Sequence, residues 1–364
     1  MKKFTAISAA SLLLVACGES RPTYLLSGTV DTLYNGATVS LLYGEKSDST
    51  VVSQGAFSFE GEIDSPVLAR VLISQGDNRT GGMVVLEAGS PVLTLTEEGY
   101  RCSGTPLNET FNGYNASSEE LYKTYREAYT SLREQGLKDE EFRAALEQAG
   151  ETFSAGSRKL NEEFFAANKD NVLGSVVITR LADDKSQFDS LYNVAGEAVR
   201  NAASVQQEKA RYENLEKTSE GKMFTDFTIE KGSAEGTPVS LSDYVGKGKY
   251  VLVDFWASWC GPCISGMNRI KQLYETYRAA GLEVIGVSLD SRREAWLRAI
   301  EKEGLPWSNI SNLDGWQTGF DSYGIQSLPS FVLIRCSDGQ IVARKPWGRA
   351  SHIPVGEIEK LLGQ

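Results

Sequence analysis

The 364-residue sequence is poor in the side chains that bind metal ions, with one histidine and five cysteines. A tetrahedral zinc site needs four ligands, which are usually supplied as two close-spaced pairs. Cys260 and Cys263 form such a pair, whereas Cys102, Cys336 and His352 each stand alone. We therefore expect no metal site.

Positive charge is also scarce, because 37 lysines and arginines stand against 48 aspartates and glutamates, for a formal net charge of -11. Binding to nucleic acid requires a basic surface that neutralises phosphates, so the composition argues against a nucleic-acid partner. Long apolar runs are missing too. After the N-terminus, no segment is long and apolar enough to be expected to cross a membrane.

The N-terminus has the pattern of an export signal. Lys2 and Lys3 precede a short apolar run over residues 7–15. This run is too short to span a bilayer as a mature helix, which favours a segment that is removed after export. The pattern predicts a location outside the cytoplasm, where disulfide chemistry is permitted.

Residues 14–17, Leu-Val-Ala-Cys, resemble the lipobox of bacterial lipoproteins. The resemblance implies a signal peptide over residues 1–16, acylation of Cys17, and a tether over residues 17–23. The protein would then be anchored by lipid to a membrane of the bacterial cell envelope and face the periplasm. The alternative is an ordinary signal peptide with a chance cysteine.

The remaining chain divides into three regions by composition. Residues 24–105 contain short apolar runs separated by turn residues, which predicts an all-β domain, a small sandwich or barrel. Residues 106–218 have helical periodicity and lack proline beyond Pro106. Residues 219–364 contain all six tryptophans and alternate apolar strands with helical segments. This last pattern predicts an α/β fold with a central mixed sheet and flanking helices.

The sequence of residues 106–218 predicts where the first helix of this region starts and ends. Ser117 and Glu120 can form a capping box, which favours a helix start at Ser117. Gly136 is expected to end that helix. The region contains no cysteine or histidine, which argues against metal or nucleophile chemistry within it.

The Cys260–Cys263 pair leaves several chemistries to weigh. Covalent haem attachment requires histidine directly after the second cysteine, where Ile264 stands. A static disulfide would close a very small loop and contribute little chain-entropy stabilisation. The pair lies between a predicted buried strand, 250–256, and a predicted amphipathic helix. Since a helix N-terminus favours thiolate, the position favours a redox pair with Cys260 as the exposed nucleophile and Cys263 as the shielded partner.

Residues 253–263, VDFWASWCGPC, closely resemble the active-site segment of thioredoxins. Together with the export signal, residues 219–364 resemble the TlpA/ResA group of thiol-disulfide oxidoreductases, whose domains are also called redoxin or AhpC/TSA-like. Leu328-Pro329 supports the match, because the family has a cis-proline loop there. Residues 24–105 resemble, more weakly, a domain of unknown function that precedes such thioredoxin domains in lipoproteins.

The resemblance implies a thioredoxin-like fold and a role for each matching residue. Cys260 would attack a substrate disulfide and Cys263 would resolve the mixed disulfide, with their own disulfide as the only redox group and no further cofactor. The resemblance also implies that five residues border the substrate: Trp259, Gly261, Pro262, Leu328 and Pro329.

Asp254 lies within the apolar strand, where an ionised carboxylate is costly to bury. One interpretation is a strand-end aspartate whose oxygens accept hydrogen bonds from backbone donors. The other follows from its match to the buried aspartate of thioredoxins, which implies an acid of raised pKa that accepts the proton of Cys263.

The sequence also departs from the family. Many TlpA/ResA-like proteins have an acidic residue and a proline where Gly266 and Asn268 stand, so roles attributed to that acid are not transferred. Cys102 and Cys336 are expected to be buried free thiols.

We therefore expect an envelope thiol-disulfide oxidoreductase. The Gly261-Pro262 dipeptide is that of thioredoxin, whose potential is about -270 mV, so we expect the enzyme to reduce protein disulfides rather than to form them. Its partners would be disulfide-bearing extracytoplasmic proteins and an envelope thiol electron donor, with membrane contact through the lipid anchor only. One alternative is a thiol peroxidase, although Ala257 and Val253 replace the residues that peroxiredoxins place there. Another is a surface binding lipoprotein with a regulatory redox domain.

Overall fold

The computed structural model describes residues 21–96, 99–230, 232, 236–345 and 353–363. The chain divides into two compact units, residues 1–205 and 206–364, which we describe separately. Cys17, the expected lipidation site, and His352 lie outside the described residues. Within the described ranges, no helix combines the length and the apolar character needed to cross a membrane. The division into three domains expected from the sequence stays a prediction.

The first unit begins with two four-stranded sheets, in the orders β4-β1-β7-β8 and β3-β2-β5-β6. In β4, Phe57 and Phe59 are buried while Ala56, Ser58 and Glu60 are exposed, as the period-2 pattern predicts. The all-β expectation is thus confirmed. The strands are β1 (Thr23–Thr29), β2 (Thr38–Tyr43), β3 (Lys46–Val51), β4 (Ala56–Glu62), β5 (Val67–Gln75), β6 (Asn78–Leu86), β7 (Val92–Thr96) and β8 (Gly99–Ser103).

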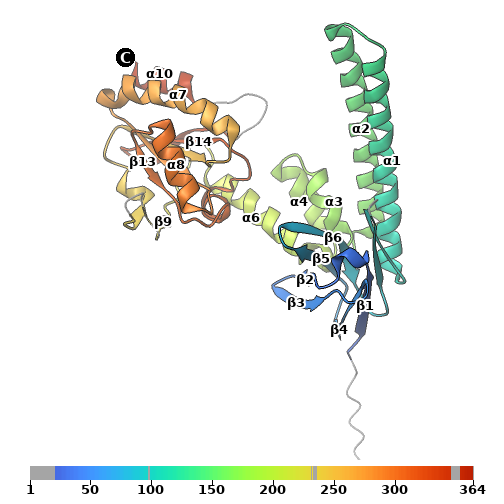
Figure 1. Ribbon diagram of the computed structural model, residues 1–364. Coiled ribbons are helices and arrows are strands. Elements are labelled where there is room, and N and C mark those ends of the chain that lie inside the picture. Colours follow the sequence, from blue (N-terminus) through green and yellow to red (C-terminus); the bar gives the residue numbers. More distant parts are fainter. Residues whose placement is uncertain (1–20, 97–98, 231, 233–235, 346–352, 364) are drawn as a thin grey trace, which may run out of the picture. The chain divides into compact units, whose positions relative to one another are not determined.

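Helices make up the rest of the first unit, and the two longest form the antiparallel hairpin seen in Figure 1. The helices are α1 (Pro106–Glu134), α2 (Asp139–Asn168), α3 (Gly174–Leu181), α4 (Lys185–Val194) and α5 (Glu197–Arg200). The predicted start at Ser117 is wrong, because α1 already begins at Pro106. There the Glu87 carboxylate accepts the backbone N–H groups of Leu107 and Asn108, at 2.8 and 3.3 Å. Gly136, with φ of 62°, follows the end of α1 as expected.

The second unit contains a five-stranded mixed sheet in the order β13-β12-β11-β14-β15. Strands β11, β12 and β13 are parallel, and β14 is antiparallel to both of its neighbours. Its strands are β11 (Tyr250–Trp256), β12 (Leu282–Ser288), β13 (Ser308–Ile310), β14 (Ser330–Arg335) and β15 (Gln340–Lys345), besides the small ribbon of β9 (Thr228–Ile229) and β10 (Val239–Ser240).

Helices cover both faces of this sheet. They are α7 (Gly261–Tyr277), α8 (Arg293–Glu303), α9 (Gln317–Tyr323) and α10 (Val355–Leu362). Most of α6 (Ala203–Lys217) also belongs to this unit, and its Asn214 side chain donates to the carbonyl oxygen of Phe320 in α9. Figure 1 shows α7 beside α10, and the Arg269–Glu359 ion pair joins them at 3.6 Å. On the opposite face, the ring of Tyr323 in α9 lies 5.5 Å from that of Phe255 in β11. The expected α/β fold is confirmed, although its patterns did not predict β13 or α9.

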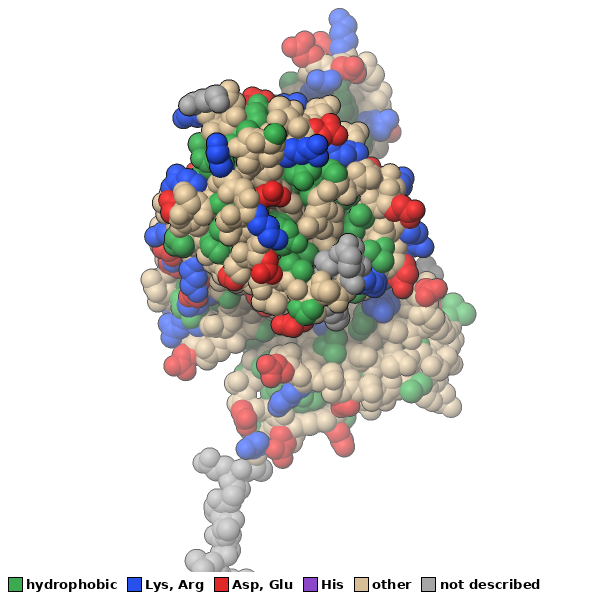
Figure 2. Space-filling model, turned by 90° about the vertical axis from the view of Figure 1, so that its left-hand side faces the viewer, with side chains coloured by type: hydrophobic (Ala, Val, Ile, Leu, Met, Phe, Trp, Pro, Cys, Tyr) green, Lys and Arg blue, Asp and Glu red, His purple; other side chains and the backbone are tan. Residues whose placement is uncertain are grey.

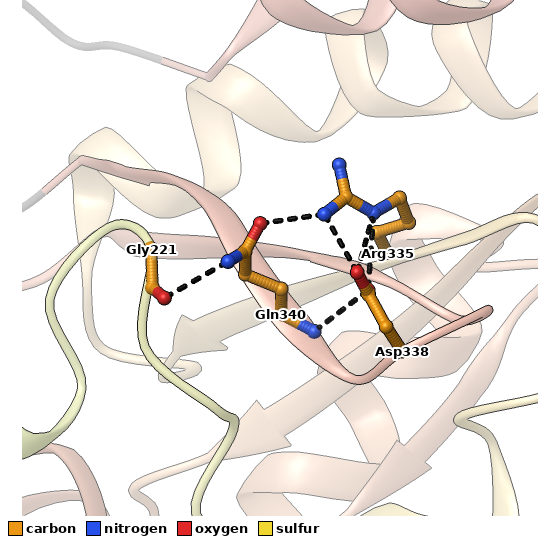
Figure 3. Close-up of polar contacts among 4 residues, drawn as sticks. All are labelled: Gly221, Arg335, Asp338 and Gln340. Carbon is orange, nitrogen blue, oxygen red and sulfur yellow. Dashed lines mark hydrogen bonds and ion pairs between the residues drawn. The ribbon is translucent and has the colours of Figure 1, made fainter.

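Figure 3 shows how the β14–β15 turn is held. The guanidinium group of Arg335 donates to the carboxylate of Asp338, at 2.7 and 3.0 Å, and to the side-chain oxygen of Gln340. Gln340 in turn donates its side-chain amide to the carbonyl oxygen of Gly221 at 3.0 Å. Gly339 has the positive φ of 70° that this turn requires. Through this contact, the turn is linked to the segment between α6 and β9.

Candidate active site

Cys260 and Cys263 form a disulfide at the N-terminus of α7, immediately after β11. Cys260 is the N-cap residue, and its sulfur accepts the backbone N–H of Cys263 at 3.2 Å. Pro262 lies in the first turn, where the absence of its N–H leaves no helical hydrogen bond unmade. Because the helix N-terminus presents free N–H groups, this position stabilises a thiolate on Cys260 when the pair is reduced.

Both cysteine residues are buried in the disulfide form. The side chains of Cys260 and Cys263 belong to residues that are 6% and 3% exposed. The expectation that Cys260 is exposed is therefore wrong for this state, because its sulfur turns back over the first turn of α7 to meet Cys263. Trp259, next to it, is 58% exposed.

A cleft of about 440 Å³ lies beside the disulfide. Pro262 and Cys263 line one side, and Pro329 and Phe331 line the other, so residues far apart in sequence meet there. The Leu328–Pro329 peptide bond is cis, as the resemblance implies. Of the five expected substrate-bordering residues, Pro262 and Pro329 thus line the cleft, whereas Leu328 is buried and Gly261 is exposed on the first turn.

The same cleft extends along α7 past the position where many relatives have an acid. Gly266 and Arg269 line it, together with Ile353 and Val355 from the segment that leads into α10. A Cβ atom added at Gly266 would have nothing within 4 Å. The cleft is therefore open at Gly266, where a larger side chain would have room.

Asp254 lies on the face of the sheet that α7 covers. Its register partner Phe331 lines the cleft with Cys263, and paired residues of neighbouring strands point to the same face. Asp254 is 1% exposed, and neither of its carboxylate oxygens has a hydrogen-bond partner among the described residues. This finding disfavours the interpretation with backbone donors. Burial raises the pKa of Asp254 to about 8.

Asp290, which the sequence interpretation missed, holds the segment before the disulfide. This buried carboxylate follows β12 and accepts hydrogen bonds from Ser258 and from the hydroxyl group of Ser288. The available signal was weak, because an aspartate directly after an apolar strand is also common in turns. Its partner Ser258 lies two residues before Cys260, so Asp290 holds the loop that carries Cys260.

Trp316 is a second residue that the sequence interpretation missed. Its ring lies 5.9 Å from the ring of Trp259, at an interplanar angle of 52°. Both residues present surface to solvent, with 58% of Trp259 and 38% of Trp316 exposed. The two rings form an apolar surface beside Cys260, which we call the tryptophan pair. No spacing in the sequence connects these residues, because they are brought together by the crossing from β13 to α9.

The other cysteines are separate from this site. Cys102 is buried and free in the first unit, and burial raises the pKa of its thiol to about 12. Cys336 is also free but half-buried, so the expectation of full burial was wrong for it. Across the described part of the chain, no cluster of three or more histidine, cysteine, aspartate or glutamate side chains could hold a metal ion.

Comparison with known protein families finds matches for two regions of the chain. Residues 221–343 match the AhpC/TSA family, and residues 24–111 match a domain of unknown function, DUF4369. A thiol-disulfide oxidoreductase ResA of Halalkalibacterium halodurans is 31% identical over 142 residues, which cover 39% of this chain and 76% of that protein. The ResA of Oceanobacillus iheyensis is 42% identical over 139 residues, 38% of this chain and 61% of that protein.

Solved structures of thiol-disulfide oxidoreductases also align with part of this chain. The thioredoxin domain of a thiol-disulfide oxidoreductase from Bacteroides vulgatus is 31% identical and covers 40% of this chain and 98% of that one, with a TM-score of 0.34. The curated relatives carry the assignment. The chain belongs, through its C-terminal region, to the thioredoxin-like thiol-disulfide oxidoreductases of the AhpC/TSA family, and it is a redox enzyme that acts on disulfides.

Proposed function

We propose that this enzyme reduces disulfides of extracytoplasmic proteins through a cycle of the Cys260–Cys263 pair. The observation that carries the proposal is the position of this pair, at the N-terminus of α7 and on the face of the sheet where Asp254 is buried. The helix end favours the Cys260 thiolate, and a buried acid is suited to exchange a proton with the second thiol.

In the proposed cycle, the Cys260 thiolate attacks one sulfur of a client disulfide, and the other client sulfur leaves as a thiolate and takes up a proton. Cys263 gives its proton to Asp254, and its sulfur attacks Cys260. This step forms the Cys260–Cys263 disulfide and releases the second client sulfur as a thiolate, which takes up the proton from Asp254. Two electrons and two protons from an envelope thiol donor then restore the reduced enzyme.

The client segment is proposed to lie in the cleft, extended along the cis-proline loop. Pro262 and Pro329 line that cleft, and strand-like pairing with the loop backbone near Leu328 would hold the segment. Gly261 has no side chain over the first turn of α7, which leaves access to the Cys260 sulfur. Trp259 provides apolar contact at the other side of Cys260.

The location and the remaining partners are proposals from the sequence. Acylation at Cys17 would anchor the enzyme to a membrane of the cell envelope with its redox unit in the periplasm. Figure 2 shows acidic and basic side chains interspersed over the face in view. This distribution agrees with the net charge of -11 in favouring protein clients over nucleic acid.

Insulin reduction by the full chain, expressed without its first 17 residues, tests the proposal. We expect dithiol-dependent reduction of the insulin disulfides by the wild type and none by Cys260→Ser. A Cys263→Ser variant should accumulate mixed disulfides with its clients in cells, while Cys260→Ser should accumulate none. Equal insulin reduction by wild type and Cys260→Ser would refute the reductase assignment.

A further inference from the structure

One row of residues crosses three neighbouring strands beneath α7. Asp254 of β11 pairs with Gly286 of β12, and Gly286 pairs with Asn309 of β13. Residues paired in this way point to the same face of the sheet. Asp254 and Asn309 therefore project on the face covered by α7, on either side of a residue that has no side chain.

Two polar side-chain atoms lie where a side chain of residue 286 would project from the sheet. A Cβ atom at Gly286 would lie 2.3 Å from the side-chain oxygen of Asn309 and 2.9 Å from the indole nitrogen of Trp256. Glycine is thus required at this position so that both groups can approach the row. Trp256 lies two residues after Asp254 on the same strand, so its side chain projects from the same face.

These groups share an unmet need for hydrogen bonds. Asp254, Asn309 and Trp256 are 1%, 4% and 0% exposed. Both oxygens of Asp254, the side-chain oxygen of Asn309 and the indole nitrogen of Trp256 have no hydrogen-bond partner among the residues that the structure describes. Buried polar groups without partners are costly, and in proteins they are commonly joined by an ordered water molecule.

The orientation of Asn309 is set by another contact. Its side-chain N–H group donates to the carbonyl oxygen of Trp307 at 2.9 Å, which leaves the side-chain oxygen toward Gly286. This oxygen is only an acceptor, and the indole N–H of Trp256 is only a donor. One water molecule can accept from Trp256 and donate to Asn309 at the same time.

We propose that Asn309 and Trp256 hold one water molecule against the carboxyl group of Asp254, and that Asn309 is a positioning residue for the proton transfer assigned to Asp254. The proposal rests on the proposed function of Asp254. When Asp254 is ionised, the water donates to it and to Asn309 and accepts from Trp256, so both of its O–H groups are used. When Asp254 is protonated, its O–H donates to the water, which still donates to Asn309.

The water therefore remains bonded in both protonation states and stabilises the ionised one more. Among the residues that the structure describes, the row positions beside Asp254 are Gly286, Asn309 and Phe331, none of which is charged, and Cys263 of α7 lines the same cleft as Phe331. Lys345, beyond Phe331 in the row, is paired with Glu357 at 2.7 Å. Trp256 pairs with Ser288 of β12, and Asp290 lies two residues beyond Ser288 along the chain. The carboxylate of Asp290 already accepts hydrogen bonds from Ser258.

The test is the titration of the Asp254 carboxyl group in the oxidised full chain, monitored by infrared spectroscopy. The absorption band of this carboxyl group is identified because it disappears in Asp254→Asn. Asn309→Leu removes one of the two groups that retain the water, so the ionised form of Asp254 loses the water that stabilises it, and the midpoint of the titration should move to higher pH by about one pH unit. Trp256→Phe removes the indole donor, together with part of a fully buried ring, but keeps Asn309, and should move the midpoint in the same direction by less. Because the two substitutions alter different elements, a folding defect in one leaves the other as a test.

The direction of the change decides between explanations. A midpoint that moves to lower pH in Asn309→Leu would show that Asn309 accepts the proton of Asp254 directly, without water. An unchanged midpoint in both variants would overturn the proposal. The readout uses the oxidised protein without substrate, so it is independent of whether insulin is reduced, and failure of the proposed function would be seen separately in Cys260→Ser.

Activity provides a second readout. In reduced Asn309→Leu, the pH profile for reduction of oxidised glutathione should shift in the same direction as the infrared titration. In the Asp254→Asn background, the Asn309→Leu substitution should leave the profile unchanged, since the group through which it acts is gone. A shift that persists in that background would assign to Asn309 a purely structural role.

Discussion

The carboxylate of Asp290 accepts two hydrogen bonds from Ser258, from its backbone N–H at 2.8 Å and from its hydroxyl group at 2.6 Å. Ser258 lies two residues before Cys260, so this contact fixes the loop between β11 and α7 from the end of the neighbouring strand. A third bond, from the hydroxyl group of Ser288 at 2.8 Å, completes the environment of the carboxylate. The loop that carries Cys260 is thus held by a buried carboxyl group outside the motif.

Removal of this contact should cost both stability and rate. Hydrogen bonds to charged groups contribute about 1.5–3 kcal/mol, and we expect Ser258→Ala to lower the free energy of unfolding by an amount in that range. Small displacements of reacting groups are expensive, so insulin reduction should fall about tenfold. The control is Ser219→Ala, which removes a hydroxyl group bonded to an exposed carbonyl oxygen. If both variants behave alike, Asp290 does not position the loop.

The pKa of Asp254 predicts how stability depends on pH. Burial raises this pKa from 3.8 to about 8, so the folded protein holds the proton more tightly than the unfolded chain between these values. The free energy of unfolding should therefore decrease as pH rises from about 4 to about 8, by about 1.4 kcal/mol for each unit of pKa difference that is realised. Asp254→Asn should lose this decrease and become the more stable protein at pH 8.

Tryptophan fluorescence can measure this difference in the oxidised full chain, because all six tryptophans lie in the second unit. The matched control is Glu275→Gln, which neutralises an exposed carboxylate on α7. We expect the control to follow the wild type across the whole range. Parallel curves for Asp254→Asn and the wild type would contradict the raised pKa. Turnover of Asp254→Asn should be slower at every pH at which Cys263 must lose its proton.

Local patterns were sufficient to predict much of the second unit and the centre of its site. The apolar run of β11 followed by Cys260, Pro262 and Cys263 predicts a strand, a helix start and a redox pair without reference to any other segment. Asp254 was recognisable because a charged residue interrupts that run. These signals lie within about a dozen residues, where strand and helix periodicities are informative.

The missed features depend on contacts between distant segments. Asp290 is 32 residues from Ser258, and Trp316 reaches Trp259 only through the order of the strands. Asn309 lies on β13, a three-residue strand too short for a period to be read. The early start of α1 has the same origin, since Glu87 of the β region satisfies the N–H groups of Leu107 and Asn108. Topology decides these contacts, and a single sequence does not display it.

The tryptophan pair predicts a preference among clients. Trp316 lies beside Trp259, and together they offer exposed aromatic surface next to Cys260. Apolar groups that flank a client cysteine would be desolvated there, and an aromatic pair contributes about 0.5–1.5 kcal/mol beyond its buried area. We expect Trp316→Ala to raise KM for insulin several-fold and to leave reduction of oxidised glutathione nearly unchanged. Leu361→Ala, which removes an exposed apolar side chain on α10, is the control. Equal losses with insulin and glutathione would exclude a role in client binding.

Gly266 predicts the effect of restoring the acid that many relatives have. A side chain fits there, because a Cβ atom would have nothing within 4 Å and the backbone is helical. Gly266→Glu should raise the free energy of unfolding by about 0.5–1 kcal/mol through helix propensity alone. The new carboxylate would also line the cleft with Cys263 and disfavour its thiolate, so client reduction should become slower and its pH profile should move to higher pH.

Gly266→Gln separates the charge from the size of the added side chain. It should give a similar gain in stability and narrow the cleft to the same extent, but it should leave the pH profile in place. Arg269, three residues further along the same helix, can pair with the new carboxylate and reduce its effect, so Gly266→Glu combined with Arg269→Gln should show the largest shift. If the glutamate and glutamine variants have identical pH profiles, a charge at this position does not act on Cys263, and the open cleft at Gly266 affects only which client segments fit.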